Sequence, residues 1–303
     1  METILLENSQ MSVSLVPDFG ARIVALCDKR TGRDWIAARA SFGSAADGAG
    51  YGAREATGWD ECFPTVGKCV ATGGSAQRDH GDLWGRPWTV TKVSRTMIAA
   101  HFARPDYRFA RTLMLAGGGL NCEYQVDNIS NAPLSYLWAM HALFSLTPGD
   151  RIDLPAGSPC RTTYRSDGQA ARTVAWPDGA AFPLSLVQPV ERAFAAKLLI
   201  DRGPEQGIRV GNSSGSLLIT AERQLSGSVG LWLCYGGWPG SQSVHQVAIE
   251  PTSAPADDLA AAEAMGRAIT IPPGRSATWW TKLALGPGLD APPSPTFLTG
   301  RAI

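Results

Sequence analysis

The chain has 303 residues, 44% of them hydrophobic and 18% charged, a composition typical of a folded globular protein with a large core. Lysine plus arginine and aspartate plus glutamate both number 27, so the net charge is zero. That balance disfavours nucleic acid and anionic membranes as partners and favours a small neutral ligand. No apolar stretch is long enough for a signal peptide or a bilayer span, and the six cysteines are scattered singly. We therefore expect a cytoplasmic protein with reduced thiols and no membrane association.

Short apolar or alternating stretches dominate the chain, and 33 Gly and 21 Pro supply the turns between them. The clearest strand alternates Leu120, Cys122, Tyr124 and Val126 with polar neighbours, which places one apolar face against a core. In chain order, strands are predicted near residues 11–16, 21–28, 88–102, 108–116, 120–126, 134–146, 216–222, 229–235, 244–250 and 277–285.

One helix is predicted, over Ala256 to Arg267, where Asp257 and Asp258 suit the positive end of a helix dipole. Many closely spaced strands with few helical patterns predict an all-β fold, a large antiparallel β-sandwich with one or few short helices. No linker divides the chain, so we expect a single domain over 1–303, with a Pro-rich surface tail from residue 286.

Three motifs that suggest other chemistry are better explained by local structure. GNSSG at 211–215 matches a nucleophile-elbow string but lies between two strand-like segments, which indicates a hairpin turn. The Gly-rich segment at 43–52 lacks the lysine and the context of a phosphate-binding loop, and we interpret it as a mobile loop. Cys62, Cys69 and His80 lack the close spacing of zinc ligands. We therefore expect no metal and no cofactor.

Two segments, 58–67 and 79–88, combine charged groups with aromatic rings, the mixture that sugar sites use against hydroxyl rims and C–H faces. Phe63 and Trp88 fit core positions, whereas His80 in a Gly-flanked turn favours ligand contact. The side chains that supply the mixture are Trp59, Asp60, His80, Asp82, Trp84, Arg86 and Trp88.

Two titratable residues stand out later in the chain. His141 interrupts an otherwise apolar strand, and Glu250 follows Val247 and Ile249 and precedes Pro251 at a strand end. From the residues alone, His141 is either a satisfied core histidine or a functional group, and Glu250 is either solvated or functional.

The order of these motifs resembles the galactose mutarotase-like superfamily, in particular its aldose 1-epimerase-related branch. The resemblance rests on GWDE-x-FP at 58–64, DHG-x-LW at 79–84, and the opening PDFGARIVALCDKRTGRDW. It implies the large β-sandwich, with His80 in the substrate-binding His-Gly motif. It also implies that His141 is the catalytic acid and Glu250 the catalytic base, with no cofactor required.

Departures from the family's patterns bear on the sugar. Hexose-6-phosphate 1-epimerases carry an arginine where this chain has Trp84, and another where it has Gly58 or Trp59. The Asn-Gly-Arg element of galactose mutarotases has no obvious counterpart here. The basic side chains that could meet an anionic substituent, or simply be solvated, are Arg22, Arg54 and Arg86.

Anomerisation needs a proton removed from the anomeric hydroxyl and another delivered to the ring oxygen. A carboxylate and an imidazole can share that work. We therefore expect an isomerase that interconverts α and β anomers of a hexose or related sugar. Asp60, Trp84, Arg86 and Arg22 are further candidates for substrate binding. The alternatives are a non-catalytic carbohydrate-binding module on the same fold, and a lyase or glycosidase, for which no carboxylate partner of Glu250 is evident.

Overall fold

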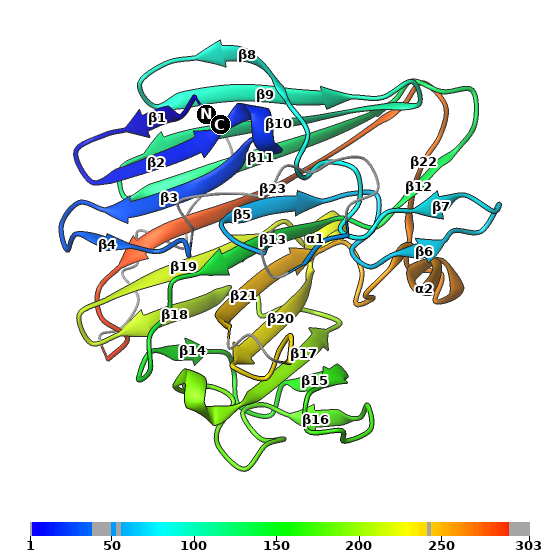
Figure 1. The fold of residues 1–303 in the computed structure, drawn as a ribbon. Coiled ribbons are helices and arrows are strands. Elements are labelled where there is room, and N and C mark those ends of the chain that lie inside the picture. The colour runs from blue at the N-terminus through cyan, green and yellow to red at the C-terminus, as the bar shows by residue number, and fades with distance from the viewer. Residues whose placement is uncertain (1, 38–49, 53–55, 241–243, 291–303) are drawn as a thin grey trace.

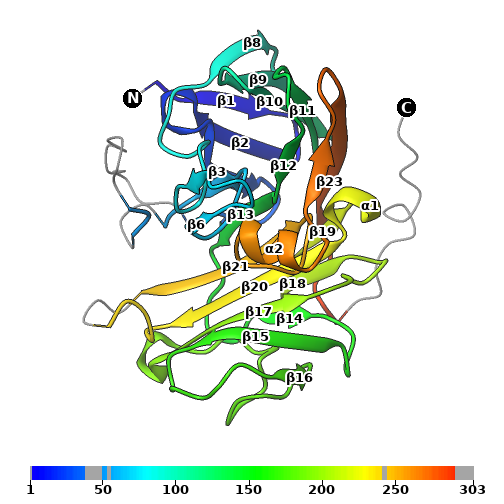
Figure 2. The same cartoon turned by 90° about the vertical axis from the view of Figure 1, so that its right-hand side faces the viewer.

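Two large antiparallel sheets stacked face to face make up the molecule (Figures 1 and 2). The structure is a computed structural model, and it describes residues 2–37, 50–52, 56–240 and 244–290. The expected all-β sandwich is confirmed. Among the described residues no helix is both long and apolar enough to pass through a membrane.

The first sheet has 11 strands and carries the candidate site. In spatial order its strands are β1 (Ile4–Glu7), β2 (Met11–Val16), β3 (Arg22–Asp28), β5 (Trp59–Cys62), β13 (Ala139–Phe144), β21 (His245–Thr252), β20 (Ser228–Tyr235), β17 (Phe194–Ile200), β15 (Pro159–Arg165) and β16 (Thr173–Ala175), with β4 (Arg33–Asp34) paired to β3.

The second sheet has eight strands, and the remaining elements are short. Its spatial order is β14 (Arg151–Asp153), β18 (Ile208–Asn212), β19 (Gly215–Ala221), β23 (Ser276–Gly286), β11 (Gly119–Asn128), β10 (Tyr107–Ala116), β9 (Met97–Ala103) and β8 (Thr89–Val93). The small pairs β6 (Cys69–Val70) with β7 (Ala76–Gln77) and β12 (Leu134–Tyr136) with β22 (Ile269–Ile271) gather with α2 (Leu259–Ala264) on one side in Figure 1. The last elements are α1 (Arg223–Ser226) and the 3-10 turns Pro17–Phe19 and Val190–Arg192.

Two predicted strands are wrong in extent, because the chain breaks each of them. The segment 88–102 is a hairpin of β8 and β9, turned where the Ser94 hydroxyl accepts a hydrogen bond from the Met97 N–H at 3.0 Å. The segment 134–146 divides into β12 and β13. Between them the Leu137 N–H donates to the Pro64 carbonyl at 2.8 Å, and the Trp138 N–H donates to the Ser253 hydroxyl at 2.9 Å. Those bonds take the backbone out of the ladder.

The predicted helix is shorter than expected. It begins after Asp258, whose carboxylate caps it by accepting from the Ala261 N–H at 2.8 Å, and it ends before Gly266, which has a φ of +66°. The hairpin expected at 211–215 is confirmed, because β18 pairs with β19 from Asn212 opposite Gly215. Most of the Gly-rich segment 43–52 and the tail beyond residue 290 lie outside the described residues.

A buried ion pair joins the two sheets across the core. Glu61 on β5 accepts from the Arg111 guanidinium on β10 at 2.9 Å, and from the indole N–H groups of Trp59 and Trp138 at 3.0 Å each. The Tyr124 hydroxyl adds a fourth donor at 3.2 Å. Burial outweighs the charge of Arg111 and raises the pKa of Glu61 to about 7. The expected core positions of Phe63 and Trp88 are confirmed, since both side chains are buried.

Candidate active site

A row of polar residues crosses neighbouring strands of the 11-stranded sheet. Asp60 on β5 pairs in register with His141 on β13. The β13 to β21 register, defined on both sides of His141, places Glu250 opposite it, and Gly230 on β20 pairs with Glu250 in turn. Because residues directly opposite on adjacent strands lie about 5 Å apart, this register alone brings the groups together.

Strand alternation decides which face these residues occupy. Met140 and Ala142, the neighbours of His141, and Ile249, the neighbour of Glu250, all pack in the core between the sheets. Successive side chains point to opposite faces of a sheet, so His141 and Glu250 point to the outer face. Glu61, by the same rule, lies on the core side and outside the candidate site.

Arg22 on β3 holds Asp60 in a two-pronged ion pair. Its Nε donates to Asp60 Oδ1 at 2.7 Å, its Nη2 pairs with Oδ2, and its Nη1 donates to the Thr57 carbonyl at 3.0 Å. Both side chains are buried. Burial raises the pKa of Asp60 and the Arg22 charge opposes that rise. Arg22 is therefore already engaged in an ion pair with Asp60.

His141 is 6% exposed and lies among polar groups. Its Nε2 is 3.9 Å from Glu250 Oε1, too long for a hydrogen bond, and its Nδ1 is 3.3 Å from the hydroxyl of Tyr51. Burial, reinforced by nearby His80 and by the positive charges of Lys197 and Arg22, holds the pKa of His141 well below its ordinary 6.5. The imidazole is thus mainly neutral at pH 7.

Glu250 forms a close ion pair with Lys197 of β17, two strands away. The pair spans β20 at Gly230, where an added Cβ would lie 2.7 Å from Glu250 Oε2 and 3.2 Å from Lys197 Nζ. Burial alone would lower the pKa of Lys197, but the Glu250 carboxylate outweighs it and the shift is upward. Glu250 Oε1 is buried and accepts no hydrogen bond from any described residue. One carboxylate oxygen is therefore held by an ammonium group, and the other faces His141 without a hydrogen bond to any residue that the structure describes.

A tight turn brings His80 to the same cluster. His80 has a φ of +58° and Gly81 a φ of +71°, and a Cβ at Gly81 would overlap the backbone of Phe63. The ring of His80 stacks on Tyr51 at 3.7 Å between centroids and meets the edge of His141 at 4.9 Å. Its Nδ1 is 3.0 Å from the Asp79 carboxylate.

The other predicted residues lie around this cluster. Trp84 is fully buried, donates to the Asp79 carbonyl at 2.9 Å and packs under the Arg78 guanidinium at 3.8 Å, so it supports the turn and offers no exposed ring to a sugar. Arg86 accepts from the Gly20 N–H through its carbonyl at 2.6 Å. Asp82 pairs with Arg104 at 2.9 Å. Arg54 lies outside the described residues.

Sequence reasoning missed Lys197 and Tyr51. The sequence does indicate Lys197, because FAAKLLI at 194–200 places one lysine in an apolar strand, where a charged side chain needs a partner. Tyr51 had none, because it lies in a Gly-rich segment without periodicity. Among the described residues, no three His, Cys, Asp or Glu side chains gather as a metal would require.

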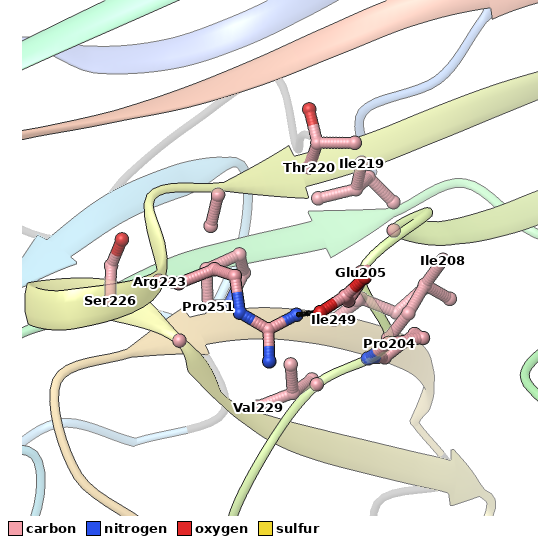
Figure 3. A pocket seen from close by; sticks show the side chains of 14 residues that line it. Pro204, Glu205, Ile208, Ile219, Thr220, Arg223, Ser226, Val229, Ile249 and Pro251 are labelled. Carbon is pink, nitrogen blue, oxygen red and sulfur yellow. Dashed lines mark ion pairs between the residues drawn. The ribbon is translucent and has the colours of Figure 1, made fainter. Parts of the chain in front are cut away.

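Two hollows lie away from this cluster. The first, between β19, β20 and β21, has a volume of about 40 Å³, and Figure 3 shows Arg223 pointing toward Glu205 beside it, at 3.2 Å. Small-molecule pockets usually hold roughly 300–1,000 Å³, so it is too small for a sugar. The second has a volume of about 450 Å³, and its lining includes no histidine that could act as the acid beside a carboxylate base. Its lining residues are Asp201, Arg202, Arg223, Gln224, Gly227, Ser228, Ser253 and Arg267.

The fold is similar to that of solved galactose mutarotase-like structures. The galactose 1-epimerase of Lactobacillus acidophilus NCFM is 15% identical, with a TM-score of 0.64 over 94% of each chain. A galactose mutarotase-like protein from Clostridium acetobutylicum is 14% identical, with a TM-score of 0.66 over 94% of this chain and 95% of its own. One from Lactobacillus casei ATCC 334 is 16% identical, with a TM-score of 0.63 over 94% and 100%.

No protein-family model and no curated protein sequence matches the chain. At identities near 15% a structural likeness establishes the fold alone. The resemblance expected from the sequence motifs is confirmed at that level.

Proposed function

We propose that the protein is an aldose 1-epimerase-type isomerase that interconverts the α and β anomers of a neutral hexose or related sugar. The observation that carries this proposal is the facing pair of His141 Nε2 and Glu250 Oε1, buried, 3.9 Å apart and not bonded to each other. A hemiacetal carbon carries two oxygens that must exchange protons, and such a pair can serve one oxygen each. Structural neighbours named as epimerases and mutarotase-like proteins add support.

The chemistry needs one base and one acid. Glu250 Oε1 accepts the proton of the anomeric hydroxyl, the C1–O1 bond becomes a carbonyl, and the C1 to ring-oxygen bond breaks. The ring oxygen takes a proton from His141 Nε2. After the aldehyde turns over, the ring closes with the two roles exchanged, so no proton or electron is gained or lost overall. Each group is expected to contribute about 10²- to 10⁴-fold.

A neutral sugar fits the charges of the cluster. Arg22 is neutralised by Asp60 and Lys197 by Glu250, and both pairs are buried. His80, at the rim of the cluster, has a side chain that is 20% exposed and can reach a sugar hydroxyl.

The test is equilibration of freshly dissolved pure anomers of several hexoses, followed by polarimetry or proton NMR against buffer. Glu250→Gln and His141→Ala should each slow equilibration at least about 10²-fold. Matched controls, Glu123→Gln on β11 and His101→Ala on β9 in the other sheet, should leave the rate unchanged. Saturable sugar binding without acceleration would instead identify a non-catalytic module, and cleavage of an oligosaccharide would identify a glycosidase or lyase.

A further inference from the structure

The hydroxyl of Tyr51 joins two residues of the cluster. It lies 3.3 Å from Asp60 Oδ2 and 3.3 Å from His141 Nδ1, and its ring lies flat on His80. Burial, with the nearby charge of Asp60, raises the pKa of Tyr51 well above its ordinary value of 10, so the hydroxyl keeps its proton. The Tyr51 hydroxyl has one proton and lies near two polar atoms, so it can donate a hydrogen bond to only one of them.

Asp60 determines the direction of that proton. Its two oxygens accept from Arg22 Nε and Nη2, a fork that matches an ionised carboxylate. An ionised carboxylate can only accept hydrogen bonds, so the Tyr51 hydroxyl must donate to Asp60 Oδ2. Its oxygen is then free to accept a proton donor on the other side, and that donor is His141 Nδ1.

We propose that Asp60 and Tyr51 form a hydrogen-bonded chain that holds neutral His141 as its Nδ1–H tautomer. The order of donation is His141 Nδ1–H to Tyr51, then Tyr51 O–H to Asp60. The opposite ring nitrogen, Nε2, then carries no proton, and it is the atom that faces Glu250 Oε1 at 3.9 Å. Tyr51 is thus a positioning residue, which acts on the reaction through His141.

A catalytic consequence follows, and it rests on the proposed function. In the resting state both facing atoms, His141 Nε2 and Glu250 Oε1, are proton acceptors, so the pair must take up one proton before it can act as acid and base together. The groups that face His141 are Tyr51, Asp60, His80, Glu250, Lys197 and Arg22. Because the cations among them and burial disfavour imidazolium, the rate constant should rise as the pH falls below 7.

The decisive experiment is a histidine ¹⁵N NMR spectrum of the free full-length protein near pH 8, which distinguishes Nδ1–H from Nε2–H imidazole without any sugar. The chain has four histidines, and the signals missing from His141→Gln identify His141. We expect an Nδ1–H pattern in the unmodified protein. In Tyr51→Phe, which retains the ring but cannot accept, the nearby Glu250 carboxylate should draw the proton to Nε2. Tyr164→Phe on β15, a tyrosine 41% exposed, is the matched control.

An Nε2–H pattern for His141 in the unmodified protein would overturn the proposal, because His141 Nδ1 would then carry no proton to donate to Tyr51 and the order of donation would be reversed. An unchanged tautomer in Tyr51→Phe would overturn it as well. With an active sugar in hand, Tyr51→Phe should also lower kcat/KM about tenfold or more, part of the ~10²- to 10⁴-fold that a proton-transfer group supplies. The tautomer is measured without substrate, so the result holds whether or not the protein proves to be an isomerase.

Discussion

Gly230 lies directly opposite Glu250 on neighbouring strands, and the missing side chain is what lets Lys197 reach the carboxylate from one strand further away. Three strands therefore form the ion pair. Strand β17 carries Lys197, β21 carries Glu250, and β20 places a glycine without a side chain between them. Gly230 has an ordinary backbone conformation, so its contribution to the ion pair is the room that its missing side chain leaves.

Gly230→Ala should separate the Lys197 and Glu250 charges. The added methyl would lie 2.7 Å from Glu250 Oε2, a contact that only a shift of the two flexible side chains can relieve. We expect at least about a tenfold loss of anomer equilibration, since small displacements of reacting groups are costly, with the circular dichroism spectrum unchanged. Gly215→Ala, at a strand glycine where a Cβ meets nothing within 4 Å, is the control. Full activity in Gly230→Ala would show that the spacing is not needed.

Lys197→Met should destabilise the fold more than removal of both charges. Without its partner, the buried Glu250 carboxylate is left unpaired, which typically costs about 3–5 kcal/mol in the free energy of unfolding. Lys197→Met with Glu250→Gln should recover most of that loss in urea titrations. The exposed pair of Lys29 and Glu7, 2.7 Å apart, provides the comparison, and Lys29→Met should destabilise the fold much less than Lys197→Met. A double variant no more stable than Lys197→Met would contradict the buried-pair interpretation.

Glu61 should make stability fall as the pH rises from about 4.5 to about 7. Its pKa is about 7 in the folded chain and 4.5 ordinarily, so the folded state holds the proton more tightly in that window. The contribution is complete below the unfolded pKa and is lost through the folded pKa, with a slope of up to about 1.4 kcal/mol per pH unit.

The pH dependence of Glu61 can be isolated by substitution. The slope should be absent from denaturant titrations of Glu61→Gln, with Glu61→Gln/Arg111→Met as a second variant that leaves no unpaired guanidinium. Glu123→Gln, exposed on β11, should retain the wild-type slope. Equal slopes in wild type and both Glu61 variants would assign the titration to other groups.

A neutral hexose should be a better substrate than its 6-phosphate. Arg22 and Lys197 are already neutralised by Asp60 and Glu250, so a phosphate would enter a cluster in which both of these buried cations already have a carboxylate partner. The measurement is kcat/KM for the two sugars at low and at 0.5 M salt. A preference for the phosphate that disappears in salt would show that a cation other than these two recognises it.

The sequence predicts which strand residues share one face of a sheet and the order of the site residues along the chain. It predicts fewer of the contacts between their side chains. Alternation in 120–126 depends on local patterning and is present in the structure. The strand-end position predicted for Glu250 is wrong, because β21 continues through Pro251 to Thr252 and Glu250 pairs with Gly230 inside the ladder. The reach of Lys197 over Gly230 depends on pairing between segments some 30 residues apart, and no local pattern encodes that register. Tyr51 acts through three-dimensional position alone. The contact of Trp84 with the Arg78 guanidinium was not predictable either, because the sequence does not distinguish an aromatic ring that faces a ligand from one that faces a guanidinium.

The adjacency of Asp60 and Glu61 limits how this protein can vary. Asp60 serves the outer face through Arg22, and Glu61 ties β5 to the opposite sheet through Arg111. Since a shift of one residue exchanges the two faces of a strand, a single insertion or deletion in β5 would place each carboxylate against the other's arginine environment. A change in the length of β5 should therefore be tolerated less well than substitutions along it, and laboratory diversification of the site should keep residues 59–62 at constant length.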